Sequence, residues 1–265
     1  MEEGHPRENA MLLQGKSGIV FGVANKRSIA YACAQSASAQ GATLILTYQN
    51  ERVEKTVKEL ADNLPNEAIA IPCDVGTEAG LDAAFEQIAD HMPQPHFGVH
   101  SIAFAPREEL EGRFCDTTRD GWNTALDVSA YSFTSLARRM EPLMTEGGSL
   151  VTMTYFGSEK VMPHYNVMGP AKAALEASVR YLAADMGPNN IRINAVSAGP
   201  IRTLAASGVS GFSQFLDIAR EKAPLRRNTS RDEVGDATVF LVSDLSRGVT
   251  GTTLWVDCGY HIMAL

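Results

Sequence analysis

The chain has 265 residues and a net charge of −8, and 45% of its residues are hydrophobic and 20% charged. These proportions are ordinary for a globular protein and exclude a disordered or fibrous one. The acidic balance leaves no basic face for a phosphate backbone, so nucleic acid is not expected as a partner. No apolar run approaches the roughly 20 residues that span a bilayer, so no membrane segment is expected.

The length fits one large α/β domain, and no linker or repeat divides it. Residues 1–11 are polar and lack the apolar core of a secretory signal, so we expect a flexible extension before a single domain over residues 12–265. The four cysteines are widely spaced and no histidines have a metal-ligand spacing, so the sequence predicts neither a disulfide framework nor a metal site. Buried thiols in a reducing cytoplasm are the simpler interpretation.

Short apolar runs alternate with helical segments along the whole chain. The expected strands span residues 18–21, 43–47, 68–71, 97–100, 149–153, 191–196 and 252–257. The expected helices span residues 28–40, 52–64, 81–91, 122–144, 171–185 and 232–243. Strict alternation of this kind predicts βαβ units and a parallel sheet. Right-handed crossovers then give a doubly wound, Rossmann-type sheet with helices on both faces, which binds ligands beyond the carboxyl ends of its strands.

The turn after the first strand is compatible with a dinucleotide site, although it lacks the usual Gly-x-Gly-x-x-Gly. Gly22 permits a tight exit from the strand, and Ser28 can cap the helix that follows. The free N–H groups of that helix would face a pyrophosphate. An ordinary βα loop explains the same residues equally well, so the turn alone leaves both interpretations open.

Polar or small residues also follow the next strands. Gln49 is neutral where an acidic residue would bind an adenosine ribose, and the nearest base is Arg52, which favours NADH over NADPH. Asp74 can either meet the adenine amino group or cap the following helix. Residues 101–106 are mostly small or apolar and suit the passage of a cofactor.

Two tyrosines and a lysine follow the fifth strand. Tyr165 and Lys172 are nearly two helical turns apart, at about 3.6 residues per turn, so they can share one face. A lysine near a phenol favours the phenolate, and a phenol beside a developing enolate can hydrogen-bond or protonate it. In isolation the pair is equally compatible with an interface aromatic and a solvated charge. Its place after the fifth strand of a dinucleotide fold favours chemistry.

Residues 165–177, YNVMGPAKAALEA, resemble the active-site helix of bacterial enoyl-acyl-carrier-protein reductases, a divergent branch of the short-chain dehydrogenases/reductases. The resemblance continues through residues 194–208, 22–30, 47–50 and 100–106, and so covers nearly the whole chain from 12 to 260. Ordinary members of the wider family carry Tyr-x3-Lys, but the residue four before Lys172 is Met168. The wider spacing disfavours a general ketoreductase.

The resemblance implies that NADH delivers a hydride to the β-carbon of a trans-2-enoyl thioester on acyl carrier protein, the last step of the fatty-acid elongation cycle. The implied catalytic residues are Tyr155, Tyr165 and Lys172. Tyr165 would hydrogen-bond the thioester carbonyl as it becomes an enolate, Lys172 would hold the nicotinamide ribose and add positive potential, and Tyr155 would lie beside the acyl chain and assist. The implied cofactor contacts are Gly22, Ser28, Ile29, Gln49, Asp74, Val75, Ser101, Ile102, Ala103, Lys172, Ile201 and Thr203. The implied substrate contacts are Ala105, Tyr155, Tyr165, Ala206 and Phe212. The resemblance also implies a homotetramer in which residues 255–260 pack between subunits.

Two local features lead to further expectations. Pro170 would cost about 3 kcal/mol inside a helix, so we expect the helix to begin near residues 167–169, with Tyr165 just before it. Residues 203–216 are small, apolar and interrupted by glycine, and their apolar side chains would be poorly placed in a plain surface loop. We interpret this segment as a mobile lid that covers the acyl chain.

Other functions fit the sequence less well. A reductase of ketones or branched enoyl thioesters is disfavoured by the tyrosine spacing and by Tyr155. A dinucleotide-binding module without catalysis would not be expected to retain the tyrosine–lysine pair. A serine hydrolase is excluded because the sequence around Ser210 lacks the last glycine of Gly-x-Ser-x-Gly.

Overall fold

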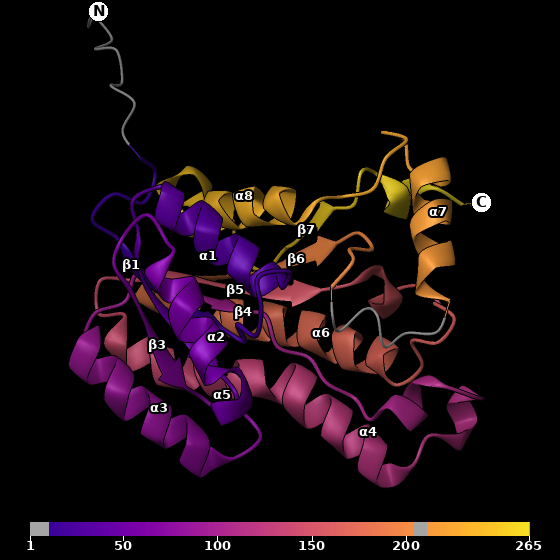
Figure 1. Ribbon diagram of the computed structural model, residues 1–265, viewed down its shortest axis with the longest axis horizontal. Coiled ribbons are helices and arrows are strands. Elements are labelled where there is room, and N and C mark those ends of the chain that lie inside the picture. The colour runs from indigo at the N-terminus through magenta and orange to yellow at the C-terminus, as the bar shows by residue number, and fades with distance from the viewer. Residues whose placement is uncertain (1–10, 204–210, 265) are drawn as a thin grey trace, which may run out of the picture.

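The computed structural model describes residues 11–203 and 211–264 (Figure 1). The predicted extension therefore lies outside the described residues, except for Met11. Leu12 is exposed, whereas the next residue, Leu13, is fully buried in the core. Leu13 is thus the first buried core residue in the part of the chain that the structure describes.

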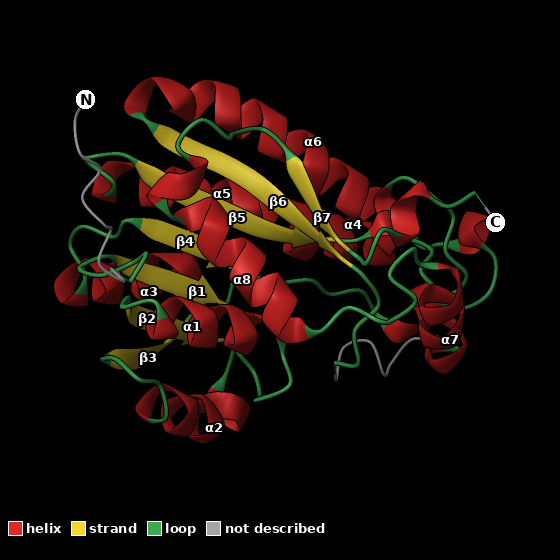
Figure 2. Ribbon diagram, turned by 90° about the horizontal axis from the view of Figure 1, so that it is seen from above, coloured by secondary structure: helices red, strands yellow, loops and turns green. Residues whose placement is uncertain are grey.

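Seven strands form one parallel sheet in the order β3-β2-β1-β4-β5-β6-β7 (Figure 2). The strands are β1 (Ser17–Phe21), β2 (Thr43–Tyr48), β3 (Ala68–Pro72), β4 (Phe97–His100), β5 (Gly148–Thr154), β6 (Ile191–Ala198) and β7 (Thr253–Val256). The helices are α1 (Ile29–Ala39), α2 (Glu51–Asp62), α3 (Glu78–His91), α4 (Arg119–Leu126), α5 (Ser132–Met140), α6 (Met168–Met186), α7 (Phe212–Lys222) and α8 (Arg231–Val242). The predicted doubly wound α/β sheet is confirmed.

Helices cover both faces of the sheet (Figure 1). Side chains of α1, α2 and α8 pack in one apolar cluster, and those of α3, α5 and α6 pack in another. Successive strand residues point to opposite faces, so Leu46 belongs to the first cluster and Ile45 to the second. Both residues are fully buried, as expected for strands with helices on both sides.

Two helical segments differ from the sequence-based expectation. The continuous helix expected over residues 122–144 is divided by a π-helical turn, Asp127–Tyr131, between α4 and α5. Within this region Ser132 Oγ donates a hydrogen bond of 2.6 Å to the Val128 carbonyl, four residues back. A side-chain hydrogen bond to a carbonyl four residues earlier competes with the regular backbone hydrogen bonds of the helix and is found where helices bend. Helix α7 was not predicted, and it includes the C-terminal part of the segment interpreted as a lid.

No helix within the described ranges is both long enough and apolar enough to cross a membrane.

Helices α1 and α8 approach closely because Gly235 on α8 has no side chain. A Cβ placed at Gly235 would lie 2.8 Å from the Ala32 carbonyl oxygen and 2.5 Å from Ser36 Oγ, both on α1. A larger residue must therefore push the helices apart or force a rotamer change.

We expect Gly235→Val to lower the free energy of unfolding by about 1–3 kcal/mol, because it overpacks the contact between α1 and α8. The measurement is urea unfolding followed by circular dichroism. Gly187→Ala is the matched control, because a Cβ there meets no atom within 4 Å. Equal stability of the Gly235→Val and wild-type proteins would contradict the close approach.

Candidate active site

The strand order reverses between β1 and β4, which makes the carboxyl ends of these strands the ligand crevice of the sheet. Gly22 leaves β1 with a φ of +90°, a conformation that favours glycine. A Cβ at this position would lie 2.5 Å from the Ser101 carbonyl oxygen and 2.7 Å from the Ile102 side chain. The predicted tight exit at Gly22 is confirmed, and it places the turns after β1 and β4 side by side.

The start of α1 is suited to bind an anion. Ser28 caps the helix, as predicted, and its Oγ accepts a hydrogen bond of 3.2 Å from the Tyr31 amide. The helix begins at Ile29, and its first turn contains no acidic residue. Helix N-termini carry partial positive charge and free N–H groups, so this turn fits a pyrophosphate.

The predicted adenosine contacts lie at the ends of β2 and β3. Gln49 is exposed directly after β2. Asp74 and Val75 are partly exposed after β3. The alternative that Asp74 caps α3 is wrong, because Thr77 is the cap and accepts a hydrogen bond of 3.0 Å from the Gly80 amide. Asp74 Oδ1 instead accepts a hydrogen bond of 3.1 Å from the Gly76 amide.

The segment after β4 is fixed by the π turn. Ser129 Oγ accepts a hydrogen bond of 3.0 Å from the Phe104 amide and donates one of 3.1 Å to the Phe104 carbonyl. At the other end of the segment, the Ser101 amide donates to the Phe21 carbonyl at 3.1 Å. These contacts hold the predicted cofactor residue Ala103 and the predicted substrate residue Ala105 in a defined path.

The remaining predicted contacts lie beyond β6. Ile201 is buried and Thr203 is partly exposed. Ala206 lies outside the described residues. Phe212 is the first residue of α7 and is partly exposed.

Tyr155 and Tyr165 form an edge-to-face pair. Their ring centroids are 5.1 Å apart and their planes make an angle of 67°. Tyr155 directly follows β5, and Tyr165 precedes α6, which begins at Met168 with Pro170 in its first turn, as predicted. Tyr165 also packs, with Ala105, on a small apolar cluster that includes the first turn of α6.

The polypeptide around this pair is sterically constrained. His164 and Asn166, on either side of Tyr165, have φ values of 59° and 37°, which are uncommon for residues with side chains. A Cβ on Gly157 would lie 2.5 Å from the Tyr165 ring. Glycine at this position therefore allows the ring to lie against the backbone between the two tyrosines.

Lys172 lies on α6 and is only 5% exposed. Its Nζ donates a hydrogen bond of 2.8 Å to the carbonyl oxygen of Met153, near the end of β5. Burial lowers the pKa of Lys172 to about 8, and the nearby Glu176 acts in the opposite direction. The ammonium form therefore predominates at neutral pH.

Tyr165 lies before α6, so it does not share a helical face with Lys172 as the spacing predicted, and burial rather than the lysine dominates the pKa of its phenol. Burial raises the pKa of Tyr165, and the charges of Tyr155 and Glu176 raise it further. Burial, with a smaller contribution from Tyr260, also raises the pKa of Tyr155 to about 12. Both phenols therefore keep their protons at neutral pH and can donate hydrogen bonds.

His100, a site residue that the sequence analysis did not single out, is buried at the end of β4. Its Nδ1 lies 2.7 Å from Thr152 Oγ1, and its Nε2 lies 2.9 Å from Ser132 Oγ. Ser132 Oγ donates its proton to the Val128 carbonyl, so it must accept a hydrogen bond from Nε2–H of His100. Burial, together with Lys172, lowers the pKa of His100 to about 3. The polar Thr152, opposite His100 in the strand register, was the available sequence signal.

No group of three or more His, Cys, Asp or Glu side chains that could hold a metal ion occurs in the part of the chain that the structure describes.

A family model described as Enoyl-(Acyl carrier protein) reductase matches residues 22–261. The chain belongs to the enoyl-acyl-carrier-protein reductase family. It is 54% identical to the enoyl-acyl-carrier-protein reductase (NADH) FabI of Bacillus cereus over 253 residues, which are 95% of this chain and 99% of that protein. It is 53% identical to the corresponding FabI of Bacillus subtilis, over 95% of this chain and 98% of that protein.

Crystal structures in the family agree closely with this fold. The Bacillus cereus reductase with NADP+ and indole naphthyridinone matches with a TM-score of 0.94, 54% identity, and coverage of 96% of this chain and 99% of that chain. The Anaplasma phagocytophilum reductase in complex with NAD matches with a TM-score of 0.93, 49% identity, and coverage of 97% and 98%.

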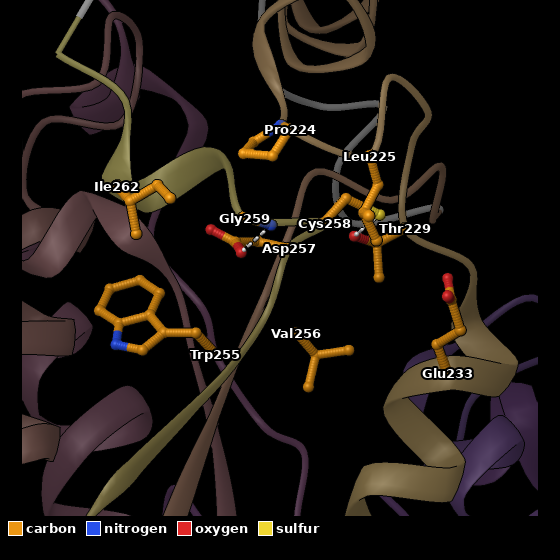
Figure 3. A pocket seen from close by; sticks show the side chains of 10 residues that line it. All are labelled: Pro224, Leu225, Thr229, Glu233, Trp255, Val256, Asp257, Cys258, Gly259 and Ile262. Atoms are coloured by element: carbon orange, nitrogen blue, oxygen red, sulfur yellow. Dashed lines mark hydrogen bonds between the residues drawn. The ribbon is translucent and has the colours of Figure 1, made fainter.

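A separate pocket of about 370 Å³ lies at the C-terminal end of the chain (Figure 3). Trp255 and Ile262 line one side and Leu225 and Glu233 another, and no predicted site residue of this reductase is among its lining residues. Trp255 also stacks on His261, with ring centroids 4.3 Å apart. The pocket is therefore distinct from the tyrosine–lysine site.

We expect Gly157→Ala to displace the Tyr165 ring, because the new Cβ would lie within 3 Å of it. The free energy of unfolding should fall by about 1–3 kcal/mol, and the near-ultraviolet circular dichroism of the tyrosine pair should change. Ser158→Ala, at the next residue, is the control and should leave the spectrum unchanged. A wild-type spectrum for Gly157→Ala would show that Tyr165 does not depend on the space at Gly157.

Proposed function

We propose that the protein reduces the trans-2 double bond of enoyl thioesters carried by acyl carrier protein, with NADH as reductant, in the last step of fatty-acid elongation. The observation that carries the proposal is the contact of Tyr155, directly after β5, with Tyr165, together with the buried Lys172, whose Nζ donates to the carbonyl of Met153 two residues before Tyr155. Membership of the reductase family supports it, as do the relatives named as NADH enzymes.

The residues of the crevice fit a dinucleotide. The capped N-terminus of α1, free of acidic residues in its first turn, would hold the pyrophosphate. Gln49 and Asp74 would contact the adenosine half, and Ser101 and Ile201 would lie along the nicotinamide half. When bound, NADH supplies the hydride, and the protein supplies orientation and electrostatics.

Tyr165 is proposed to stabilise the enolate. Its raised pKa keeps the hydroxyl proton in place, so the phenol can donate a hydrogen bond to the thioester carbonyl oxygen as negative charge develops there. The edge-to-face contact with Tyr155 limits how the Tyr165 ring can rotate. Tyr155 is therefore proposed to orient Tyr165 and to line the acyl site.

Lys172 is proposed to hold the nicotinamide ribose. One of its three N–H donors is used by the Met153 carbonyl, which fixes the ammonium beside the end of β5. The other two donors can meet the ribose hydroxyls. The positive charge also lowers the energy of an enolate that forms nearby.

Three further proposals concern the lid, the oligomeric state and the cellular location. Residues 204–210 of the segment interpreted as a lid lie outside the described residues, and we propose that its described part covers the acyl chain through the partly exposed Phe212 and Phe215 of α7. The resemblance to the family supports a homotetramer with residues 255–260 between subunits. The four free cysteines, two of them buried, are compatible with the proposed cytoplasmic location.

The proposed activity is tested by mixing the protein with NADH and crotonyl thioester and following absorbance of the reduced cofactor. We expect consumption of NADH with crotonyl thioester but not with acetoacetyl thioester. The proposed reaction transfers hydride to the β-carbon of a double bond conjugated to the thioester carbonyl, and the β-carbon of acetoacetyl thioester is a ketone instead. Consumption with acetoacetyl thioester alone would favour a ketoreductase. No consumption, with binding of NADH retained, would favour a dinucleotide-binding module.

Variants separate the two proposed roles. We expect Tyr165→Phe to lower kcat by about 100-fold or more, because the donor to the enolate is lost, with little change in NADH affinity. We expect Lys172→Ala to weaken NADH binding by roughly 10- to 100-fold, because charged hydrogen bonds to the ribose are lost. Fluorescence titration of NADH gives the affinities. Wild-type affinity in Lys172→Ala would refute the role given to the lysine.

A further inference from the structure

We propose that Glu176 is a positioning residue of this active site, whose carboxylate is held by Thr154 on the same face of α6 as Lys172 and keeps that lysine an ammonium. The inference rests on the role proposed above for Lys172. It assigns to α6 a third functional residue, one helical turn beyond Lys172.

The geometry joins α6 to the end of β5 at two consecutive points. Lys172 Nζ donates a hydrogen bond of 2.8 Å to the Met153 carbonyl. Thr154 Oγ1 donates a hydrogen bond of 2.6 Å to Glu176 Oε1. Residues four apart share one face of a helix, so Lys172 and Glu176 bind neighbouring residues of the same strand end. Tyr155 is the next residue, and this double contact therefore fixes the point from which it leaves the sheet.

The burial of both groups makes their mutual charge important. Lys172 is 5% exposed and Glu176 is 9% exposed. A buried ion is costly unless an opposite charge or hydrogen bonds compensate it. Glu176 raises the pKa of Lys172 against the effect of burial, and it also raises the pKa of Tyr165. The carboxylate thus favours the ammonium form that the proposed role of Lys172 requires.

The other groups near Lys172 do not replace this carboxylate. His100 on β4 is neutral, because its pKa is about 3. On β5 and β6 the neighbouring Thr154 and Ser197, which are paired in register, are uncharged. The remaining titratable groups on elements packed against α6 are exposed or bonded elsewhere: Asp127 and Tyr131 of the π turn, Arg119 and Asp120 of α4, Arg138 and Arg139 of α5, and Arg192 of β6.

The decisive variant is Glu176→Gln, which keeps an acceptor for Thr154 but removes the charge. The readout is the pH dependence of Lys172 acetylation by acetic anhydride, measured by mass spectrometry in the protein without NADH. We expect the midpoint to move to lower pH by about one pH unit, because the carboxylate no longer favours the ammonium. The basic limb of the kcat profile for crotonyl thioester should move in the same direction.

Matched controls separate charge from structure. Asp185→Asn removes an exposed carboxylate from the same helix and should leave the midpoint unchanged. Thr154→Val removes the hydrogen bond but keeps the charge, so it should lower thermal stability with the midpoint retained. Glu176→Asp, the conservative variant, should restore most of the wild-type midpoint.

A wild-type acetylation midpoint in Glu176→Gln would overturn the proposal. If Glu176→Gln does not fold, Thr154→Val and Glu176→Asp test the proposal, because both keep a carboxylate at this position. A fall of the acetylation midpoint by about one pH unit in either variant would then contradict it. Because acetylation needs neither NADH nor thioester, its result is independent of the proposed reduction. Failure to reduce crotonyl thioester would remove the proposed function and leave the measured link between Glu176 and Lys172 intact.

Discussion

The buried ammonium of Lys172 on the Met153 carbonyl is the constraint on which the site depends. Removing a charge from water costs several kcal/mol unless the surrounding groups compensate it. The Met153 carbonyl at the end of β5 and the carboxylate of Glu176 supply this compensation for Lys172. Their placement in turn fixes Tyr155 and the start of α6, which carries Tyr165 on its N-terminal side. A displacement of α6 by one residue would break both contacts to β5.

The doubly wound sheet supplies the rigid frame for this arrangement. Its strand order reverses between β1 and β4, so the turns at Gly22 and Ser101 meet at one edge, and the tyrosine–lysine site lies next to them on β5. The π turn between α4 and α5 then fixes the segment after β4 through Ser129. The proposed cofactor contacts and the proposed catalytic side chains thus depend on the same few strand ends.

The elements that sequence predicted well are those with strong local signals. Seven apolar runs became seven strands, and Pro170 correctly indicated that α6 begins after Tyr165. The π turn was missed because a single added residue per turn leaves the apolar periodicity almost unchanged. Helix α7 was missed because the small residues and glycines before it are typical of loops. The capping role considered for Asp74 was wrong because Thr77, three residues later, is an equally good cap.

The sequence by itself determined the layered α/β fold and the cap at Ser28, because these follow from local periodicity and side-chain type, and its resemblance to the reductase family pointed to Tyr155, Tyr165 and Lys172. Only the tertiary structure decided the protonation states of the site. The pKa of Tyr165 rises, that of Lys172 falls and His100 stays neutral because each lies in a buried environment built from distant segments. Desolvation and the charge of Glu176 depend on three-dimensional packing, which spacing along the chain does not encode.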